Sequence, residues 1–319
     1  MIYKLFFFLF IPLITVAQNA DFQKAEAYYN QEKFNEAKPL FENFLKNHPK
    51  DHRTREYLGD IACYNKNWDA GMDYYGALVE EDGQNADYHF KYGGALGMKA
   101  LSISRIRALT YIGDIKEQFT KAAELDARHI ETRWALVELY LQLPGILGGS
   151  ESKAKKYASE LQDISPVDGY LSKGYIEEHY EHEAAAETFY KKAIALGGSP
   201  MTYEKLTNFY EKSNRPEDAI KYAEKSLKLH KRNQLNYQIG KIAAEYDMEP
   251  QLGIDCLKRY IENHSYKDGV PKNWAYYRLA QIYKNLGDKQ HALDYINRAI
   301  AVNPDFEEAL EIRASIRNL

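Results

Sequence analysis

The sequence predicts an all-α protein, a right-handed α-solenoid of about eight helix pairs that ends in a C-terminal capping helix. The 319 residues include only 19 glycines and 10 prolines, and strong helix formers fill most segments. Similar segments recur, and the steps from Ala37 to Gly71 and from Phe41 to Tyr75 are both 34 residues. No segment alternates apolar and polar residues between turn residues, so no sheet is predicted.

Residues 1–17 differ from the rest and are predicted to form a signal peptide. A short basic start precedes an almost wholly apolar run at 5–16, and small Ala17 precedes polar Gln18. The run is too short to span a bilayer, which takes about 20 residues. We therefore expect cleavage before Gln18, export to the periplasm or the extracellular space, and no membrane span in the mature chain. An uncleaved anchor or a buried first helix is the alternative.

The repeats occupy residues 18–319 and are clearest near the C-terminus. The unit at 276–304 has Leu279, Ala280 and Tyr283 on a first helix, Gly287 and Asp288 in a turn, Ala292, Ile296 and Ala299 on a second helix, and Pro304 at its end. This pattern resembles the tetratricopeptide repeat, and weaker copies extend through the chain, less regularly at 86–168. The resemblance implies a concave groove lined by the first helix of each pair.

Small residues at the motif's Gly and Ala positions should let two antiparallel helices approach closely. We expect the large Tyr or Phe of each second helix to fill the space left by the next pair. Two segments break the period, at 98–114 and 143–152. Insertions in repeat arrays map to one face, often the binding face, and these two belong to adjacent pairs. We therefore expect them to lie near each other.

The two cysteines are predicted to be free and buried. Cys63 falls on the first helix of the second pair, and Cys256 falls on the second helix of the seventh pair. Helix pairs in a solenoid contact only near neighbours. A disulfide needs Cα atoms within about 7 Å, so five pairs of separation exclude a bridge within one chain.

Aromatic and acidic residues dominate the predicted groove, which suits a protein-binding surface. The predicted groove residues are Tyr29, Tyr57, Asp60, Tyr64, Phe90, Trp134, Glu138, Glu177, Tyr180, Tyr237, Trp274 and Tyr277. Glu26, Asp60, Glu138 and Glu177 are assigned to one equivalent position, which predicts an acidic ladder in the N-terminal half. About half of the aromatic residues are expected to pack between helices instead.

Some family members bind a chaperone's C-terminal carboxylate through a basic clamp on successive first helices. The equivalent positions here are Phe22, Glu26, Tyr57, Asp87 and Lys91, which lack the basic pattern. That function is therefore not implied.

Other candidate sites favour structural interpretations. The Gly-rich segment 143–152 precedes a helix and could bind an anion, but it lacks the phosphate-loop spacing, and Ser150 suits an N-cap. His179 and His182 share a helix face, yet zinc needs three or four convergent ligands, so a solvated turn is predicted. No catalytic arrangement and no cofactor site are apparent. The net charge of -4, without a basic and aromatic patch, argues against nucleic acid.

These observations predict a non-enzymatic scaffold or adaptor of the cell envelope or secreted space. Its partner would be a protein or peptide segment held in the concave groove. Trp134 is the favoured anchor, with Glu138 one turn further along the same helix face. The alternative is a carbohydrate-binding module, because aromatic faces also stack on sugars.

Overall fold

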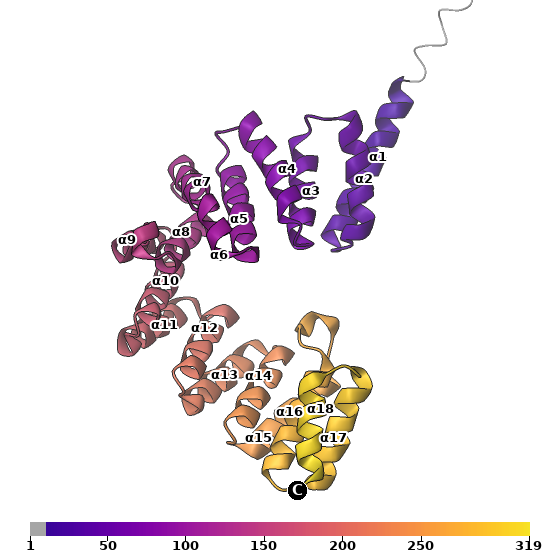
Figure 1. The fold of residues 1–319 in the computed structure, drawn as a ribbon, viewed down its shortest axis with the longest axis vertical. Coiled ribbons are helices and arrows are strands. Elements are labelled where there is room, and N and C mark those ends of the chain that lie inside the picture. The colour runs from indigo at the N-terminus through magenta and orange to yellow at the C-terminus, as the bar shows by residue number, and fades with distance from the viewer. Residues whose placement is uncertain (1–10) are drawn as a thin grey trace, which may run out of the picture. The chain divides into compact units, whose positions relative to one another are not determined.

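A computed structural model describes residues 11–319, with side chains for residues 20–265 and 267–319 (Figure 1). Within residues 11–319 all regular structure is helical and no strand occurs, so the predicted all-α fold is confirmed. None of the described helices is long and apolar enough to cross a bilayer. Residues 1–10 of the predicted signal peptide lie outside the described residues.

The chain divides into two compact units, one ending at Ile164 and the other beginning at Ser165. Four helix pairs form the first unit: α1 (Ile11–Asn30) with α2 (Phe34–Asn47), α3 (His52–Tyr64) with α4 (Trp68–Glu81), α5 (Ala86–Ser102) with α7 (Ile112–Leu125), and α8 (Ile130–Gln142) with α9 (Glu151–Ile164). Between the members of the last two pairs lie α6 (Arg105–Ala108), the 3-10 turn η1 (Leu109–Tyr111) and the 3-10 turn η2 (Gly145–Leu147).

Four more pairs and a final helix form the second unit. They are α10 (Pro166–His179) with α11 (Glu183–Gly197), α12 (Pro200–Lys212) with α13 (Pro216–His230), α14 (Asn233–Glu245) with α15 (Pro250–Glu262), α16 (Lys272–Asn285) with α17 (Lys289–Val302), and α18 (Glu307–Arg317); the 3-10 turn η3 (Tyr266–Asp268) precedes α16. The predicted eight pairs are therefore present. Phe306, Ala309 and Ile316 pack against α17 as expected of a cap.

Local residues explain where these helices begin. The Asp51 and Asn67 side chains accept hydrogen bonds from backbone N–H groups in the first turns of α3 and α4, which cap both helices. Between the helices of several pairs, the chain turns through a residue in the left-handed region. Glu32, Lys66 and Gly287 have φ values of 57°, 58° and 74°. Only the last of these positions carries the glycine that such a turn favours.

Small and large residues interlock within each helix pair. A Cβ atom added to Gly59 would lie 2.6 Å from Cε1 of Tyr75, so α3 and α4 approach closely only because Gly59 has no side chain. Gly174 and Tyr190 repeat this arrangement in the second unit. The large residue therefore fills space opposite the small residue of its own pair, whereas the sequence suggested that it would fill the next pair.

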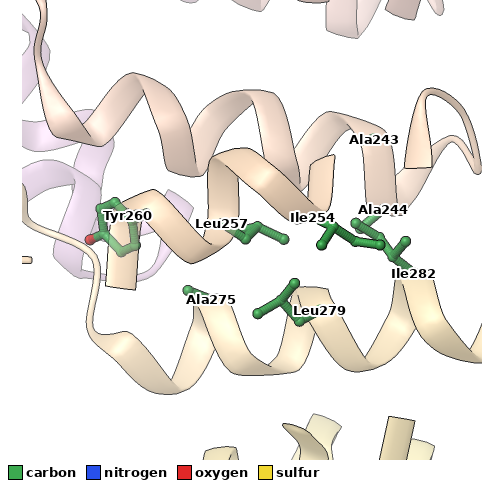
Figure 2. Close-up of a cluster of buried hydrophobic side chains, with 8 residues drawn as sticks. All are labelled: Ala243, Ala244, Ile254, Leu257, Tyr260, Ala275, Leu279 and Ile282. Atoms are coloured by element: carbon green, nitrogen blue, oxygen red, sulfur yellow. The ribbon is translucent and has the colours of Figure 1, made fainter. Parts of the chain in front are cut away.

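Burial of the apolar surface nevertheless requires the neighbouring pair. Figure 2 shows Leu257 and Tyr260 of α15 beside Ala275 and Leu279 of α16, and all four side chains are fully buried. Ala243 of α14 completes this cluster. Removal of the next pair would expose these side chains, which is why a single pair of this kind cannot stand alone.

The second insertion lies beside the helix that follows the first, as expected if the two insertions are close to each other. The first lengthens α5 to 17 residues and adds α6 and η1 before α7. The second forms η2. The Lys116 ammonium, one turn into α7, donates a hydrogen bond to the carbonyl oxygen of Leu147 in η2. This contact ties the second insertion to the helix that directly follows the first.

Both cysteines are free thiols, in agreement with the prediction. Cys256 is buried, and this burial raises the pKa of its thiol to about 11. Cys63 is only partly buried, so its predicted burial was overstated.

Candidate interaction surface

In the second unit, α10, α12 and α14 border a hollow of about 450 Å³, here called the first-helix hollow. Its lining combines cations, carboxylates, an amide and aromatic rings. The lining residues are Tyr175, Glu178, Tyr190, Lys205, Asn208, Phe209, Glu211, Lys212, Lys241, Glu245 and Tyr246. A surface of this composition offers both signs of charge and hydrogen-bonding groups to a bound segment.

Ion pairs connect each first helix of the second unit to the next. Lys212 Nζ lies 2.7 Å from an Oε atom of Glu178, which joins α12 to α10. Lys241 Nζ lies 3.0 Å from Glu211, which joins α14 to α12. In the same way Arg278 of α16 pairs with Glu245 of α14 at 2.6 Å. Because each pair spans about one repeat, the charges form a continuous ladder along the first helices.

Lys241 shows why a cation of the ladder stays protonated although it is partly buried. Burial by itself would lower the pKa of this half-buried ammonium. The hydrogen bond to Glu211 and the nearby Glu245 carboxylate outweigh burial, so the pKa of Lys241 lies above its ordinary value. The ammonium therefore remains charged at neutral pH.

Lys205 differs from the other lysines of the first-helix hollow. Its side chain is exposed and makes no hydrogen bond or ion pair within the described part of the chain. Asn208 lies one turn further along α12, and its Oδ1 atom accepts a hydrogen bond from Gln238 at 3.3 Å. The unpaired ammonium and this amide pair are the groups of the hollow best placed to receive a ligand.

The first unit carries a similar ladder, which changes the interpretation of its predicted acidic residues. Glu26 of α1 pairs with the Arg53 guanidinium of α3. Asp60 of α3 lies 2.8 Å from the Lys91 ammonium of α5, which also contacts Glu56 at 2.6 Å. Glu26 and Asp60 are therefore neutralised by cations that the sequence analysis did not identify as partners.

Tyrosine hydroxyls complete these carboxylate contacts. Tyr57 donates a hydrogen bond to Glu26 at 2.6 Å, and Tyr29 and Tyr75 donate to Asp60 at 2.9 and 2.6 Å. Burial and then the Asp60 carboxylate raise the pKa of Tyr29 and of Tyr75 well above the ordinary value. Both phenols stay protonated and serve as hydrogen-bond donors.

Two other predicted acidic residues differ from these. Glu138 is exposed on α8. Glu177 accepts a hydrogen bond from, or pairs with, His182 at 2.8 Å. It lies three residues after Gly174, whereas Asp60 directly follows the equivalent Gly59. Glu177 therefore does not occupy the position equivalent to Asp60, and that assignment was wrong.

Most of the predicted groove aromatics are partly buried and contact other rings. The paired rings and their centroid distances are Tyr57 with Phe41 at 4.8 Å, Phe90 with His129 at 5.1 Å, Tyr237 with Tyr260 at 5.3 Å, Trp274 with Phe306 at 4.6 Å, and Tyr277 with Phe306 at 5.4 Å. Tyr180 and Tyr64 are exposed, although the Tyr64 ring lies 4.4 Å from that of Phe34. Trp134 is partly buried. These rings thus combine packing with a partly accessible surface.

Lys205, Asn208, Lys241 and Arg278 were not among the residues predicted from the sequence. A signal for two of them was present, because Lys241 follows Glu211 by 30 residues and Arg278 follows Glu245 by 33. Opposite charges about one repeat apart, on equivalent faces of successive first helices, indicate an ion pair between those helices.

The other candidate sites have structural roles. Ser150 Oγ accepts a hydrogen bond from the backbone N–H of Lys153 at 3.3 Å, which confirms it as the N-cap of α9. Within the described residues, no group of three or more His, Cys, Asp or Glu side chains could hold a metal ion.

Comparison with known proteins agrees with this architecture. Family models of the tetratricopeptide repeat match residues 22–86, 202–236 and 274–306. A tetratricopeptide repeat protein from Parabacteroides merdae is similar in structure, with a TM-score of 0.52, 11% identity, and coverage of 94% of this chain and 98% of that chain. No curated protein sequence matches this one significantly.

Two further structures are more distant. YrrB, described as a TPR protein with an unusual peptide-binding site, has a TM-score of 0.44 and 18% identity over 61% of this chain and 97% of its own. TTC0263, a thermophilic TPR protein of Thermus thermophilus, has a TM-score of 0.41 and 14% identity over 76% of this chain and 98% of its own. The three family matches, the interlocked helix pairs and the capping helix together identify the chain as a tetratricopeptide repeat protein.

Proposed function

We propose that this protein is a non-enzymatic scaffold that holds an extended segment of a partner protein on its first helices. The tetratricopeptide repeat fold is in general a protein-interaction scaffold, which gives the coarser part of this function. The observation that carries the proposal is the first-helix hollow, where Lys205 is unpaired beside a ladder of satisfied charges. An unpaired cation can attract an acidic group on the partner.

The lining of the hollow favours a peptide over a sugar. Carbohydrate binding by aromatic stacking needs open ring faces, whereas Tyr237, Trp274 and Tyr277 already contact other rings. The hollow instead offers ammonium, carboxylate and amide groups, which match the charges and the backbone of a polypeptide. We further propose, from residues 1–17 alone, that the scaffold works in the cell envelope or outside the cell.

A pull-down from cell-envelope extract tests the hollow. We expect Lys205→Glu to reduce recovery of a protein partner, because it replaces the unpaired cation by an anion. Lys221→Glu is the matched control, since Lys221 is exposed on α13, away from the lining of the hollow. Equal partner recovery with both variants would contradict the proposal, and retention of the protein on glycan resin would favour the carbohydrate alternative.

Substitution of Trp134 tests whether the first unit also contributes to partner binding. If it anchors the partner, Trp134→Ala should weaken binding by at least about 2 kcal/mol, as truncation of an interfacial hot spot does. Glu138→Gln should cost less and mainly reduce salt sensitivity, because Glu138 is exposed. A binding titration is run beside thermal unfolding. Lost stability would assign Trp134 to packing, and unchanged binding with unchanged stability would remove it as an anchor.

A further inference from the structure

The two insertions hold the most exposed large apolar side chains of the described structure. Ile146 of η2 is 94% exposed, and Leu101 and Ile106 are each 81% exposed, more than any other such residue among the described side chains. Leu109 adds a fourth, at 48%. Exposed apolar side chains that gather in one part of a structure, unlike ones scattered singly, mark a site of interaction.

Three of these side chains, those of Leu101, Ile106 and Leu109, lie in the first insertion together with two arginines. Leu101 lies in the last turn of α5, Arg105, Ile106 and Arg107 lie in α6, and Leu109 begins η1. Both α6 and η1 contact α5, which places the five residues in one part of the structure, here called the insertion tip. The contact of Lys116 with Leu147 holds η2, and with it Ile146, against the start of the helix that follows the tip.

The charged residues of the insertion tip itself are all cations. Residues 88–113 contain no Asp or Glu, although these make up 46 of the 319 residues of the chain, about one in seven. Two cations of this stretch are neutralised elsewhere, since Lys91 pairs with Asp60 and Lys99 pairs with Asp69. The guanidinium groups of Arg105 and Arg107 make no ion pair or hydrogen bond to the described side chains, 20–265 and 267–319, or to the backbone that goes with them. The tip therefore presents free positive charge beside bare apolar side chains.

We propose that the insertion tip docks on the surface of an anionic lipid bilayer. Leu101 and Ile106 would enter the boundary between headgroups and acyl chains, while Arg105 and Arg107 would contact lipid phosphates. A soft lipid layer accepts side chains that protrude singly, whereas a peptide partner is usually held by a groove or pocket. With 81% of their surface exposed, Leu101 and Ile106 protrude and enclose no such pocket. This association is peripheral and separate from the partner surface of the first helices.

Vesicle sedimentation of the full chain tests the proposal. Vesicles of phosphatidylglycerol and phosphatidylethanolamine are compared with vesicles of phosphatidylcholine. Combined Leu101→Ser and Ile106→Ser should weaken binding to the anionic vesicles at least tenfold. Combined Arg105→Gln and Arg107→Gln should weaken it by about fivefold per arginine at low salt and reduce its salt dependence. Since residues 1–17 are common to all variants, the difference between variants is the measurement.

The matched control is Leu229→Ser with Lys228→Gln on α13, where Leu229 is 61% exposed. This variant should bind anionic vesicles as the wild type does. Substitutions at such exposed positions change stability little, and equal melting temperatures check that all variants are folded. Equal binding of the wild type to both vesicle types, or undiminished binding of the tip variants, overturns the proposal. Unchanged vesicle binding together with weaker recovery of an envelope protein would identify the tip as a protein interface instead.

Discussion

Two adjacent glycines of α5 test how closely a helix pair is packed. A Cβ atom added at Gly93 would lie 2.9 Å from the Cδ1 and Cε1 atoms of Phe119 on α7, and 3.2 Å from Cβ of Gln118. A Cβ atom added at Gly94 would meet nothing within 4 Å. Gly93 therefore lies where α5 touches α7, while Gly94 points away from it.

The two alanine substitutions should have different effects on the free energy of unfolding. Alanine is favoured over glycine in a helix by about 1 kcal/mol, so Gly94→Ala should stabilise the protein by about that amount. At Gly93 the same gain is opposed by overpacking, which costs about 1–3 kcal/mol. The Phe119 ring is only 7% exposed and has little room to move aside. Gly93→Ala should thus be less stable than Gly94→Ala by about 1–3 kcal/mol.

Urea unfolding followed by far-UV circular dichroism measures this difference. The midpoints of the wild type and both variants are compared after equal slopes have been established. Both substitutions add one methyl group to neighbouring residues of one helix, so their effects on helix propensity are equal. The difference between the two free energies of unfolding therefore reports packing alone. A Gly93→Ala variant as stable as Gly94→Ala would refute the close approach of α5 and α7 and the packing reason for small residues at this motif position.

Three further results are expected. Burial alone would raise the pKa of Glu187, but hydrogen bonds from Arg215, Lys191 and Tyr210 lower it from an ordinary 4.5 to about 2. The stabilisation from these bonds is therefore present above about pH 4.5 and lost as the pH falls towards 2. The unfolding free energy of Glu187→Gln should decline less over that range, and parallel declines would contradict this. Alkylation of unfolded, unreduced protein should modify both Cys63 and Cys256 by mass spectrometry, whereas a disulfide-linked peptide would overturn the repeat assignment. N-terminal sequencing of protein from the native host should begin at or near Gln18, and retention of residue 1 would exclude a cleaved signal.

Local sequence patterns were sufficient to predict the helix pairs. The spacing of apolar residues and the turn and capping residues act within a few positions of the chain, so Gly287, Ser150 and the 34-residue step were informative by themselves. The same patterns placed Cys63 and Cys256 on the correct helices. The separation of these helices by several pairs then followed from the linear order of a repeat array.

The partners of the charged and aromatic side chains were decided only by the tertiary structure. Asp60 was predicted as an open groove carboxylate, but stacking of the first helices brings Tyr29 and Lys91 to it, and packing of α3 against α4 brings Tyr75. Glu177 was assigned to the wrong position although the 16-residue step from Gly174 to Tyr190 repeats the step from Gly59 to Tyr75, and the contact of Gly174 with Tyr190 confirms that register. Helix formation depends on neighbours in sequence, whereas the environment of a side chain on a helix face depends on which residues from other repeats the packing places beside it.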